Sequence, residues 1–561
     1  MGASADTART ADMARVVVDC RQWAGPLRRI WTSFGYDELN WTATPRGQRN
    51  LATMHTIMEA PYTVRAHNLY TSGTGRGLPH WSSGNVYHED ATGRPVYDWS
   101  VSDPVFDAWV HHGCRPIVEL GFCPKALVPG SAALALTPMP SVYSAYEAGL
   151  WAWPPRDLRR WHDLVAATVR RYRDRYGRDV VRSWYWELWN EPDIGYWQGT
   201  VEEYCRLYDI TVAAVTGVLP EARVGGPATT GPGVPFLERF LDHCATGRNA
   251  TTGGQGTRLD FVSFHTKGAA FHPWRTYGPL GPEGAATAER ASPSTRTMLT
   301  EIRRNLTAIA RHAQFRDLPV LVDECDASVP AHWGIYDNAN FGYRNTAYYP
   351  VFQIQLMKKL LDLDGLGVAR VHAATTWSWY FEGDRYFEGT RSLFTAADIA
   401  TPLLNAYRML ARLPDQRLHV EAGHGGARAE PDGADERPEI DALAATDGRD
   451  RVSILVWHHC DDQYRQGTAS VSVALRHLPQ AGRPLRLRHY RIDHTHSNSH
   501  SAWVAAGRPQ DPGPGQRAAI RARAGLEMCA PEQEVDPAPE DLTISFELPL
   551  PGVSLLEYEA R

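Results

Sequence analysis

The sequence is poor in closely spaced cysteines and contains no CxxC pair. Its eight cysteines are scattered over 561 residues, and even Cys114 and Cys123 stand nine positions apart. A secreted disulfide framework is denser than this, so the spacing favours a reducing compartment. The first 20 residues also lack the continuous apolar stretch typical of a signal peptide. We therefore expect a cytoplasmic protein.

Long apolar runs and an excess of basic residues are also missing. No stretch of about 18 apolar residues occurs, so no membrane span is expected. The 58 Lys and Arg residues against 64 Asp and Glu give a formal net charge of −6, which offers no basic stripe for nucleic acid. No GxGxxG follows an expected strand and no P-loop occurs, so no nucleotide cofactor is expected.

Aromatic residues, in contrast, are abundant. The chain has 19 Trp and 24 Tyr within an ordinary globular composition of 43% hydrophobic and 22% charged residues. The flat faces of such rings can stack on sugars, although large cores also hold them. The composition thus raises a carbohydrate site as one option without deciding it.

Short apolar runs alternate with amphipathic segments up to about residue 410. Helical periodicity is clear in four of the amphipathic segments, at 156–176, 200–214, 298–313 and 346–361. Eight strand–helix alternations over this length predict an α/β fold, namely a (β/α)8 TIM barrel with insertions. The expected strands are 29–36, 62–69, 115–122, 182–190, 222–227, 259–265, 318–325 and 372–381.

Beyond about residue 411 the pattern changes to short strands separated by turns, which predicts a C-terminal β-sandwich. The expected strands are 419–424, 439–448, 451–460, 469–477, 486–494, 541–549 and 553–560. Two stretches rich in Gly, Pro and charge, 422–438 and 506–540, are expected to be surface loops. The segment 14–20 is expected to add a strand to the sandwich. The expected division is therefore 1–20 with the sandwich, 21–410 as the barrel, and 411–561 as the sandwich domain.

The motif WYWELWNEPD (184–193) carries the strongest chemical information. An apolar strand ends there in Asn190, Glu191 and Pro192. The carboxyl ends of barrel strands face the active site, and the proline stiffens the turn that presents the glutamate. The alternative is a buried glutamate that serves only in an ion pair.

A second apolar strand, LPVLVDECD (318–326), also ends in acids: Asp323, Glu324 and Asp326. Alone, such acids are as often structural as catalytic. By our count, however, Glu191 ends the fourth strand and Glu324 the seventh. Two carboxyl groups across a barrel mouth can lie about 5 Å apart, which is the geometry of a retaining glycosidase.

At this point the sequence resembles glycoside hydrolase family 39, which contains β-xylosidases and α-L-iduronidases. The resemblance implies that Glu191 is the acid/base, that Glu324 is the nucleophile, and that Asn190 holds the sugar 2-hydroxyl. It also implies that Arg65 and His67 line the nucleophile and the sugar. The similar segments span most of the chain: 18–35, 64–67, 117–127, 186–193, 260–268, 318–326 and 489–498.

The resemblance leaves the sugar open. His265-Thr266-Lys267 is similar to the iduronidase pattern, as are Asp337 and Arg344 of YDNANFGYR (336–344). Lys267 and Arg344 in one pocket would favour a substrate carboxylate. Alternatively, Lys267 pairs with an acid of the LPVLVDECD strand, and Arg344 only extends from a helix start.

Other features carry less weight. Trp377, with Trp379 and Tyr380, could stack on a sugar or merely pack in the barrel. HHCDD (458–462) and HTHSNSH (494–500) have metal-ligand residues, but polar loops are the favoured interpretation, and we expect no metal.

The sequence as a whole predicts a cofactor-independent, retaining exo-glycosidase. It would remove a terminal pentoside or uronide, in the manner of a β-D-xylosidase or an α-L-iduronidase. The alternatives are a transglycosylase or disaccharide-releasing enzyme of the same fold, and a non-catalytic carbohydrate-binding protein. The expected partner is a carbohydrate substrate, and the sequence carries no interface signature that would fix an oligomeric state.

Overall fold

The alternating segments of the first 410 residues fold as a parallel barrel. In the order β2-β3-β6-β7-β8-β9-β10-β11, each strand pairs with the next, and a bridge between Phe34 and Thr376 joins the last strand to the first. This is the predicted (β/α)8 barrel. The strands are β2 (Ser33–Tyr36), β3 (Tyr62–Ala66), β6 (Cys114–Leu120), β7 (Tyr185–Leu188), β8 (Arg223–Thr229), β9 (Phe261–Lys267), β10 (Val320–Asp326) and β11 (Val371–Ala374). The computed structural model describes residues 13–58, 61–73, 83–130, 150–271, 289–331, 333–377, 385–424, 427–428, 437–478, 483–535 and 541–560.

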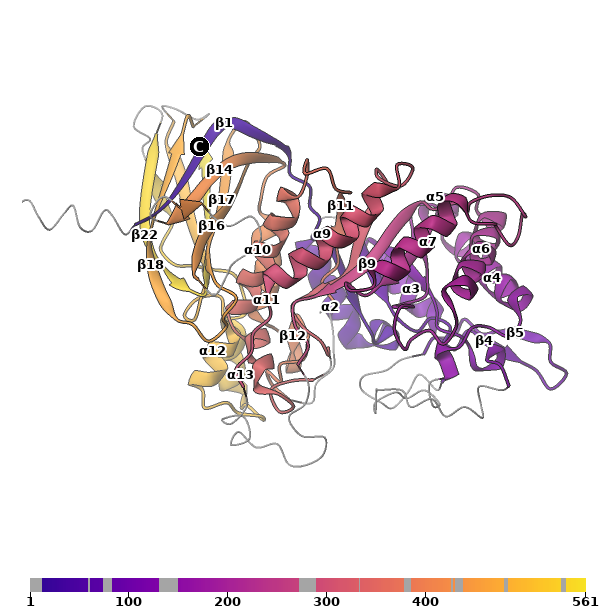
Figure 1. Cartoon of the computed structure of the whole chain (residues 1–561). Coiled ribbons are helices and arrows are strands. Elements are labelled where there is room, and N and C mark those ends of the chain that lie inside the picture. The colour runs from indigo at the N-terminus through magenta and orange to yellow at the C-terminus, as the bar shows by residue number, and fades with distance from the viewer. Residues whose placement is uncertain are drawn as a thin grey trace, which may run out of the picture.

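Helices follow the barrel strands (Figure 1). Residues of the local sequence fix where these helices begin and end. Asp157 caps one of them by accepting hydrogen bonds from two backbone N–H groups, and Gly177, at φ 88°, ends it. Thr200 and Glu203 form a capping box at the start of another. The helices are α2 (Pro45–Ile57), α3 (Ser102–His111), α4 (Leu158–Tyr176), α5 (Arg178–Val181), α6 (Val201–Val218), α7 (Val234–Thr246), α9 (Thr295–Arg311), α10 (Tyr348–Asp362) and α11 (Pro402–Ala411).

Side chains inside the barrel lie in an apolar layer with a polar layer above it. Because strand side chains alternate in direction, residues two positions apart on one strand share a face. The apolar layer is a buried cluster of Ile117, Tyr185, Phe261, Leu321 and Ala373. Two positions further along the same strands stand polar residues, Glu119, Glu187, Ser263 and Asp323, all at most 1% exposed. The apolar layer therefore closes the barrel below a buried polar layer, on which the site is built.

The C-terminal part forms a sheet of eleven described strands, antiparallel except where β1 (Ala14–Pro26) lies beside β18. Figure 1 shows β1, in indigo, running among the orange and yellow strands, where it also pairs with β14. The longer strands are β14 (Gln416–His424), β16 (Glu439–Thr446), β17 (Arg451–His459), β18 (Gly467–Arg476), β19 (Leu485–Ile492), β22 (Leu542–Leu550) and β23 (Gly552–Ala560).

The expectation of a plain loop over 506–540 is wrong. This stretch contains α13 (Pro514–Ala522), β20 (Glu527–Met528) and β21 (Gln533–Val535), and α12 (Ser499–Ala505) precedes it. Gly513 and Pro514, two of the residues that suggested a loop, lie at the start of α13, where Pro is favoured. Much of 422–438 lies outside the described residues.

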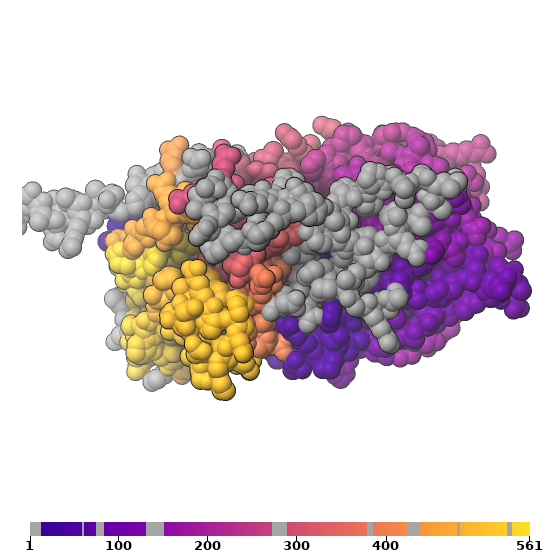
Figure 2. Space-filling model, turned by 90° about the horizontal axis from the view of Figure 1, so that it is seen from below, coloured from indigo at the N-terminus to yellow at the C-terminus, as the bar shows by residue number. Residues whose placement is uncertain are grey.

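The sandwich packs directly on the barrel. Trp457 of β17 is fully buried and donates its indole N–H to Gln355 of α10 at 3.1 Å. Asp461 accepts hydrogen bonds from Ser294 and Thr295 at the start of α9, each at 2.9 Å. Seen from below, the yellow and orange residues lie beside the barrel (Figure 2). None of the helices in the described part of the chain combines the length and apolar character needed to cross a membrane.

Candidate active site

Glu191 stands on a strained turn directly after β7. Trp189 and Glu191 adopt φ values of 68° and 45°, in the left-handed region that side-chain-bearing residues rarely occupy. The backbone N–H of Glu191 donates to the carbonyl of Ala228 at 2.9 Å, which fixes this turn to the next strand. Such strain persists only where the surroundings hold it, and here it presents the Glu191 carboxyl group to the barrel mouth.

Glu324 lies on β10, where the register with β9 shifts between Val322 and Glu324. The shift turns the Glu324 side chain toward the mouth, where it is 5% exposed. Lys267 Nζ lies 2.7 Å from Oε2, and His67 Nε2 lies 3.1 Å from Oε1. Burial alone would raise the pKa of Glu324, but the neighbouring His265, Lys267 and His67 side chains hold the pKa well below its usual range.

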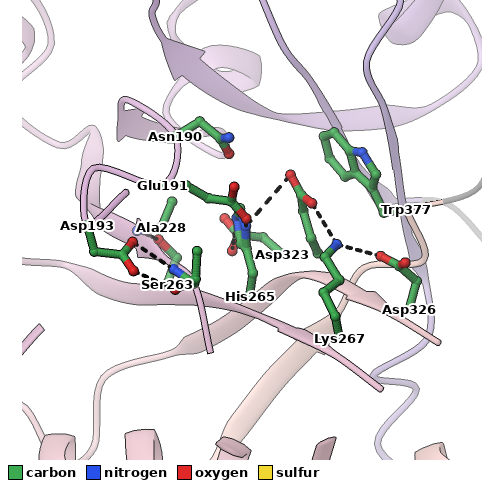
Figure 3. Close-up of polar contacts among 12 residues, drawn as sticks. Asn190, Glu191, Asp193, Ala228, Ser263, His265, Lys267, Asp323, Asp326 and Trp377 are labelled. Carbon is green, nitrogen blue, oxygen red and sulfur yellow. Dashed lines mark hydrogen bonds and ion pairs between the residues drawn. The ribbon is translucent and has the colours of Figure 1, made fainter. Parts of the chain in front are cut away.

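Glu191 and Glu324 both approach His265, whose Nδ1 lies 3.7 Å from Glu324 Oε1. Figure 3 shows Glu191 beside His265. Each of the three residues brings one polar side-chain atom within 4.8 Å of the others. Glu191 Oε1 lies 2.8 Å from His265 Nδ1. Burial, followed by the charge of Glu324, raises the pKa of Glu191 to about 7. One carboxyl group is therefore held as an acid and the other as a carboxylate, which is the division of roles that acid–base chemistry at two carboxyls requires.

Arg65 and His67 support this pair from β3 and the residue after it. Arg65 is fully buried and donates to Asn190 Oδ1 at 2.9 Å. Since the amide oxygen is taken up by Arg65, the amide N–H groups of Asn190 are the part of the side chain that can donate to another group. Burial lowers the pKa of His67, but Glu119 and the neighbouring acids more than offset it and raise the pKa to about 10. His67 is thus a cation beside Glu324 at neutral pH.

Trp377 follows β11 and forms a wall of the site. Its ring is 1% exposed and lies 4.5 Å, between ring centroids, from the ring of His67. Its indole N–H donates to Asp37 Oδ1 at 2.9 Å. Trp379 and Tyr380 lie outside the described residues.

Lys267 joins the cluster by pairing with acidic side chains, so its ammonium group is not a free cation. Besides Glu324, it contacts Asp326 Oδ2 at 2.6 Å, and Asp326 also pairs with Arg391. Of the two interpretations of Lys267 open from the sequence, the geometry matches pairing with acids of β10.

Asp337 and Arg344 are not brought to this cluster. Arg344 is 2% exposed, and its guanidinium donates to five backbone carbonyls, including those of Trp333 and Pro330 at 2.7 Å each. Asp337 accepts a hydrogen bond from the backbone N–H of Gly334. Both side chains therefore hold the loop between β10 and α10.

Several residues of the site are not among those expected from the sequence. Two of them, Glu119 and Glu187, carry a signal that was available: each stands two positions after an inward apolar residue of a strand. Arg391 lies in an irregular segment, where no periodicity marks it. The full set that was missed is Asp37, Glu119, Glu187 and Arg391.

The site supplies its own positive charge. Lys267, His67 and Arg65 all contact Glu324, so the charge that a metal ion would bring is already present. The histidines of 458–462 bind separate partners within the described residues: His458 faces the carbonyl of Leu548, and His459 faces Asp461.

Comparison with known proteins finds a family whose model matches most of the chain. Residues 16–534 match the family model described as glycosyl hydrolases family 39. A β-xylosidase of Geobacillus stearothermophilus is 25% identical over 457 residues, covering 80% of this chain and 77% of the relative. Human α-L-iduronidase is 25% identical over 584 residues, covering 97% and 78%. The crystal structure of a monomeric β-xylosidase from Caulobacter crescentus superposes with a TM-score of 0.74 at 24% identity, covering 97% of this chain and 99% of that one.

Proposed function

Because the chain belongs to glycosyl hydrolases family 39, we propose that it is a retaining exo-glycosidase, with Glu324 as the nucleophile and Glu191 as the acid/base. One observation carries the proposal: two carboxyl groups from different strands face one reacting position, and their pKa values are shifted in opposite directions. One oxygen of each carboxyl group lies within 4.8 Å of the other, which suits double displacement better than the wider spacing of about 6.5–9.5 Å typical of inverting enzymes.

In the first step Glu324 attacks the anomeric carbon while Glu191 protonates the departing glycosidic oxygen. In the second step Glu191, now a carboxylate, takes a proton from water, and that water releases the sugar from Glu324. Asn190, held by Arg65, is proposed to donate to the sugar 2-hydroxyl, and Trp377 to lie against the ring. Two carboxyls supply both nucleophile and proton, so the steps need no cofactor.

For the glycone, we propose a neutral pentoside, with a β-D-xyloside as the first candidate. Lys267 is paired with two carboxylates, and the guanidinium of Arg344 is taken up by backbone carbonyls. A substrate carboxylate would therefore have to displace an existing partner, at a cost in electrostatic energy. Parallel assays on nitrophenyl β-xyloside, α-L-arabinosides, β-glucuronide and α-L-iduronide decide this, and preferential cleavage of a uronide would contradict the pentoside.

Azide rescue tests the mechanism. Glu191→Ala is expected to lower kcat about 10²–10⁴-fold, and azide should restore turnover of a nitrophenyl glycoside by forming a glycosyl azide of retained configuration. Glu324→Ala with azide should give the azide of opposite configuration, because azide then replaces the nucleophile. A native reaction that releases the sugar with inverted configuration would rule out the retaining mechanism.

A further inference from the structure

Four buried polar atoms lie together behind the acid/base without a hydrogen-bond partner among the described residues. They are His265 Nε2, both carboxyl oxygens of Asp323, and Glu187 Oε1. His265 is 1% exposed, and Asp323 and Glu187 are fully buried. Unpaired buried polar atoms are costly, so a group of them in one place requires a physical explanation.

The two acids meet at a single guanidinium N–H. Arg65 Nε lies 2.7 Å from Glu187 Oε2 and 3.4 Å from Asp323 Oδ2. Two carboxylates so close would repel each other strongly, and a proton held between them removes the repulsion and gives their oxygens a partner. Burial and the neighbouring Glu187 charge raise the pKa of Asp323 well above its usual range, whereas Arg65 helps to keep the pKa of Glu187 low despite burial.

The same Asp323 lies directly behind His265. Its Oδ1 is 3.5 Å from His265 Nε2, and His265 Nδ1 is 2.8 Å from Glu191 Oε1. The contacts thus run from Asp323 in the polar layer through His265 to Glu191.

Building on the proposed function, we propose that Asp323 and Glu187 share one proton behind His265, and that this proton keeps His265 neutral and thereby keeps Glu191 the proton donor. Asp323 and Glu187 act through His265, so they are positioning residues. The shared proton stays in place throughout the reaction, and only the proton of Glu191 moves to the glycosidic oxygen and returns from water.

In this proposal the charge on Asp323 decides whether the imidazole of His265 is protonated. An ionised Asp323 would draw a proton onto Nε2, as a buried aspartate does for the imidazolium of a catalytic triad. A charged His265 beside Glu191 would then stabilise the Glu191 carboxylate, which cannot protonate a leaving group. In the structure burial lowers the pKa of His265 to about 3, and the charge of Glu324 opposes this only in part. With Asp323 neutral as well, the imidazole adds no positive charge.

Other titratable groups face this line of contacts from the neighbouring elements, and none of them is substituted in the test below, which follows the titration of Glu191. They are Arg65 and His67 on the β3 side, Glu119 on β6, Glu191 after β7, Lys267 on β9, Glu324 on β10 and Tyr204 on α6.

The pH dependence of kcat/KM tests the shared proton, because its basic limb reports the pKa of Glu191 in the free enzyme. In Glu187→Gln, Asp323 loses the acid with which it shares the proton and can ionise beside Arg65. His265 should then take up a proton, and the basic limb should move to lower pH by roughly 1–3 units.

Adding Asp323→Asn to Glu187→Gln removes the new charge, so the basic limb should return most of the way to its native position. A merely structural role of Glu187 would not be repaired by a second substitution. The control is Glu301→Gln, which removes a half-buried acid bonded to Thr266, the residue next to His265. It should leave the limb in place.

An unmoved limb in Glu187→Gln, or a double variant that keeps the shift, would overturn the shared proton. Should Glu187→Gln fail to fold, infrared difference spectra of the native protein against Asp323→Asn decide the question. A protonated carboxyl band lost on substitution, at a pH where Glu191 is ionised, supports the proposal, and its absence from the native protein overturns it. Azide rescue of Glu191→Ala reports separately on the proposed function, so either idea can fail alone.

Discussion

Lys267 and Glu324 form the residue-level contact on which the proposed nucleophile depends. Their charged atoms lie 2.7 Å apart, and the lysine is 16% exposed along its side chain. The lysine retains Asp326 as a second partner, and Asp326 retains Arg391. Removing the lysine charge therefore leaves Asp326 paired but takes one cation from Glu324.

Lys267→Met is expected to raise the pKa of Glu324. The nucleophile must be ionised to attack, so activity is lost as pH falls through that pKa. The acidic limb of kcat/KM should therefore move to higher pH, by roughly 1–3 units, on neutral and charged substrates alike.

Lys267→Arg keeps the charge and serves as the control, with an acidic limb close to the native one. A Lys267→Met enzyme that loses only uronide cleavage, with its acidic limb unmoved, would instead identify the lysine as a carboxylate ligand.

At the same scale, the residues that could be predicted from the sequence are those that stand in motifs. Glu191 and Glu324 end apolar strands, a position with a geometric meaning in a barrel. Arg344 shows the limit of this reasoning, because a sequence does not tell whether a guanidinium meets a ligand or the carbonyls of its own loop. Only the fold around it decides which acceptors lie near.

At the scale of elements, all eight barrel strands could be predicted, because each is a short apolar run between clear helical or turn signals. The helix α13 could not, since nine residues among Gly and Pro carry a weak periodic pattern. The polar layer was also missed, although period-2 alternation places Glu187 and Asp323 inside the barrel.

Strand β2 contains a close approach that demands glycine. A Cβ on Gly35 would lie 2.3 Å from two ring carbons of Trp377. Gly35→Ala should therefore push the indole off Asp37, raise KM, and destabilise the fold by about 1–3 kcal/mol through overpacking. Thermal unfolding and steady-state kinetics measure the two effects.

The matched control is Gly217→Ala on α6, where an added Cβ meets nothing within 4 Å. It should leave KM unchanged and stabilise the protein by about 0.5–1 kcal/mol, because alanine is favoured over glycine inside a helix. Equal KM values for Gly35→Ala and the native enzyme would show that Trp377 does not contact the sugar.

At the scale of the whole molecule, one apolar core runs from the barrel into the sandwich. It includes barrel residues such as Phe352 and Leu356 together with Leu455, Trp457 and Leu555 of the sandwich strands. The strand β1, from the start of the chain, pairs with β14 and β18 and thus ties the N-terminal segment to the C-terminal sheet. The limits drawn from the sequence at residues 20 and 410 stay a prediction.

This continuity predicts that barrel and sandwich unfold together. Asp461 joins the sandwich to α9 by two hydrogen bonds, and its side chain is 12% exposed. Asp461→Ala should therefore cost about 2 kcal/mol, the worth of hydrogen bonds to a charged group. In scanning calorimetry it should lower the temperature of a single transition. Glu547→Ala, which removes only an exposed contact with Ser470, should change stability by less than about 0.5 kcal/mol. Two resolved transitions, of which Asp461→Ala moves only one, would show that the shared core does not couple the two parts.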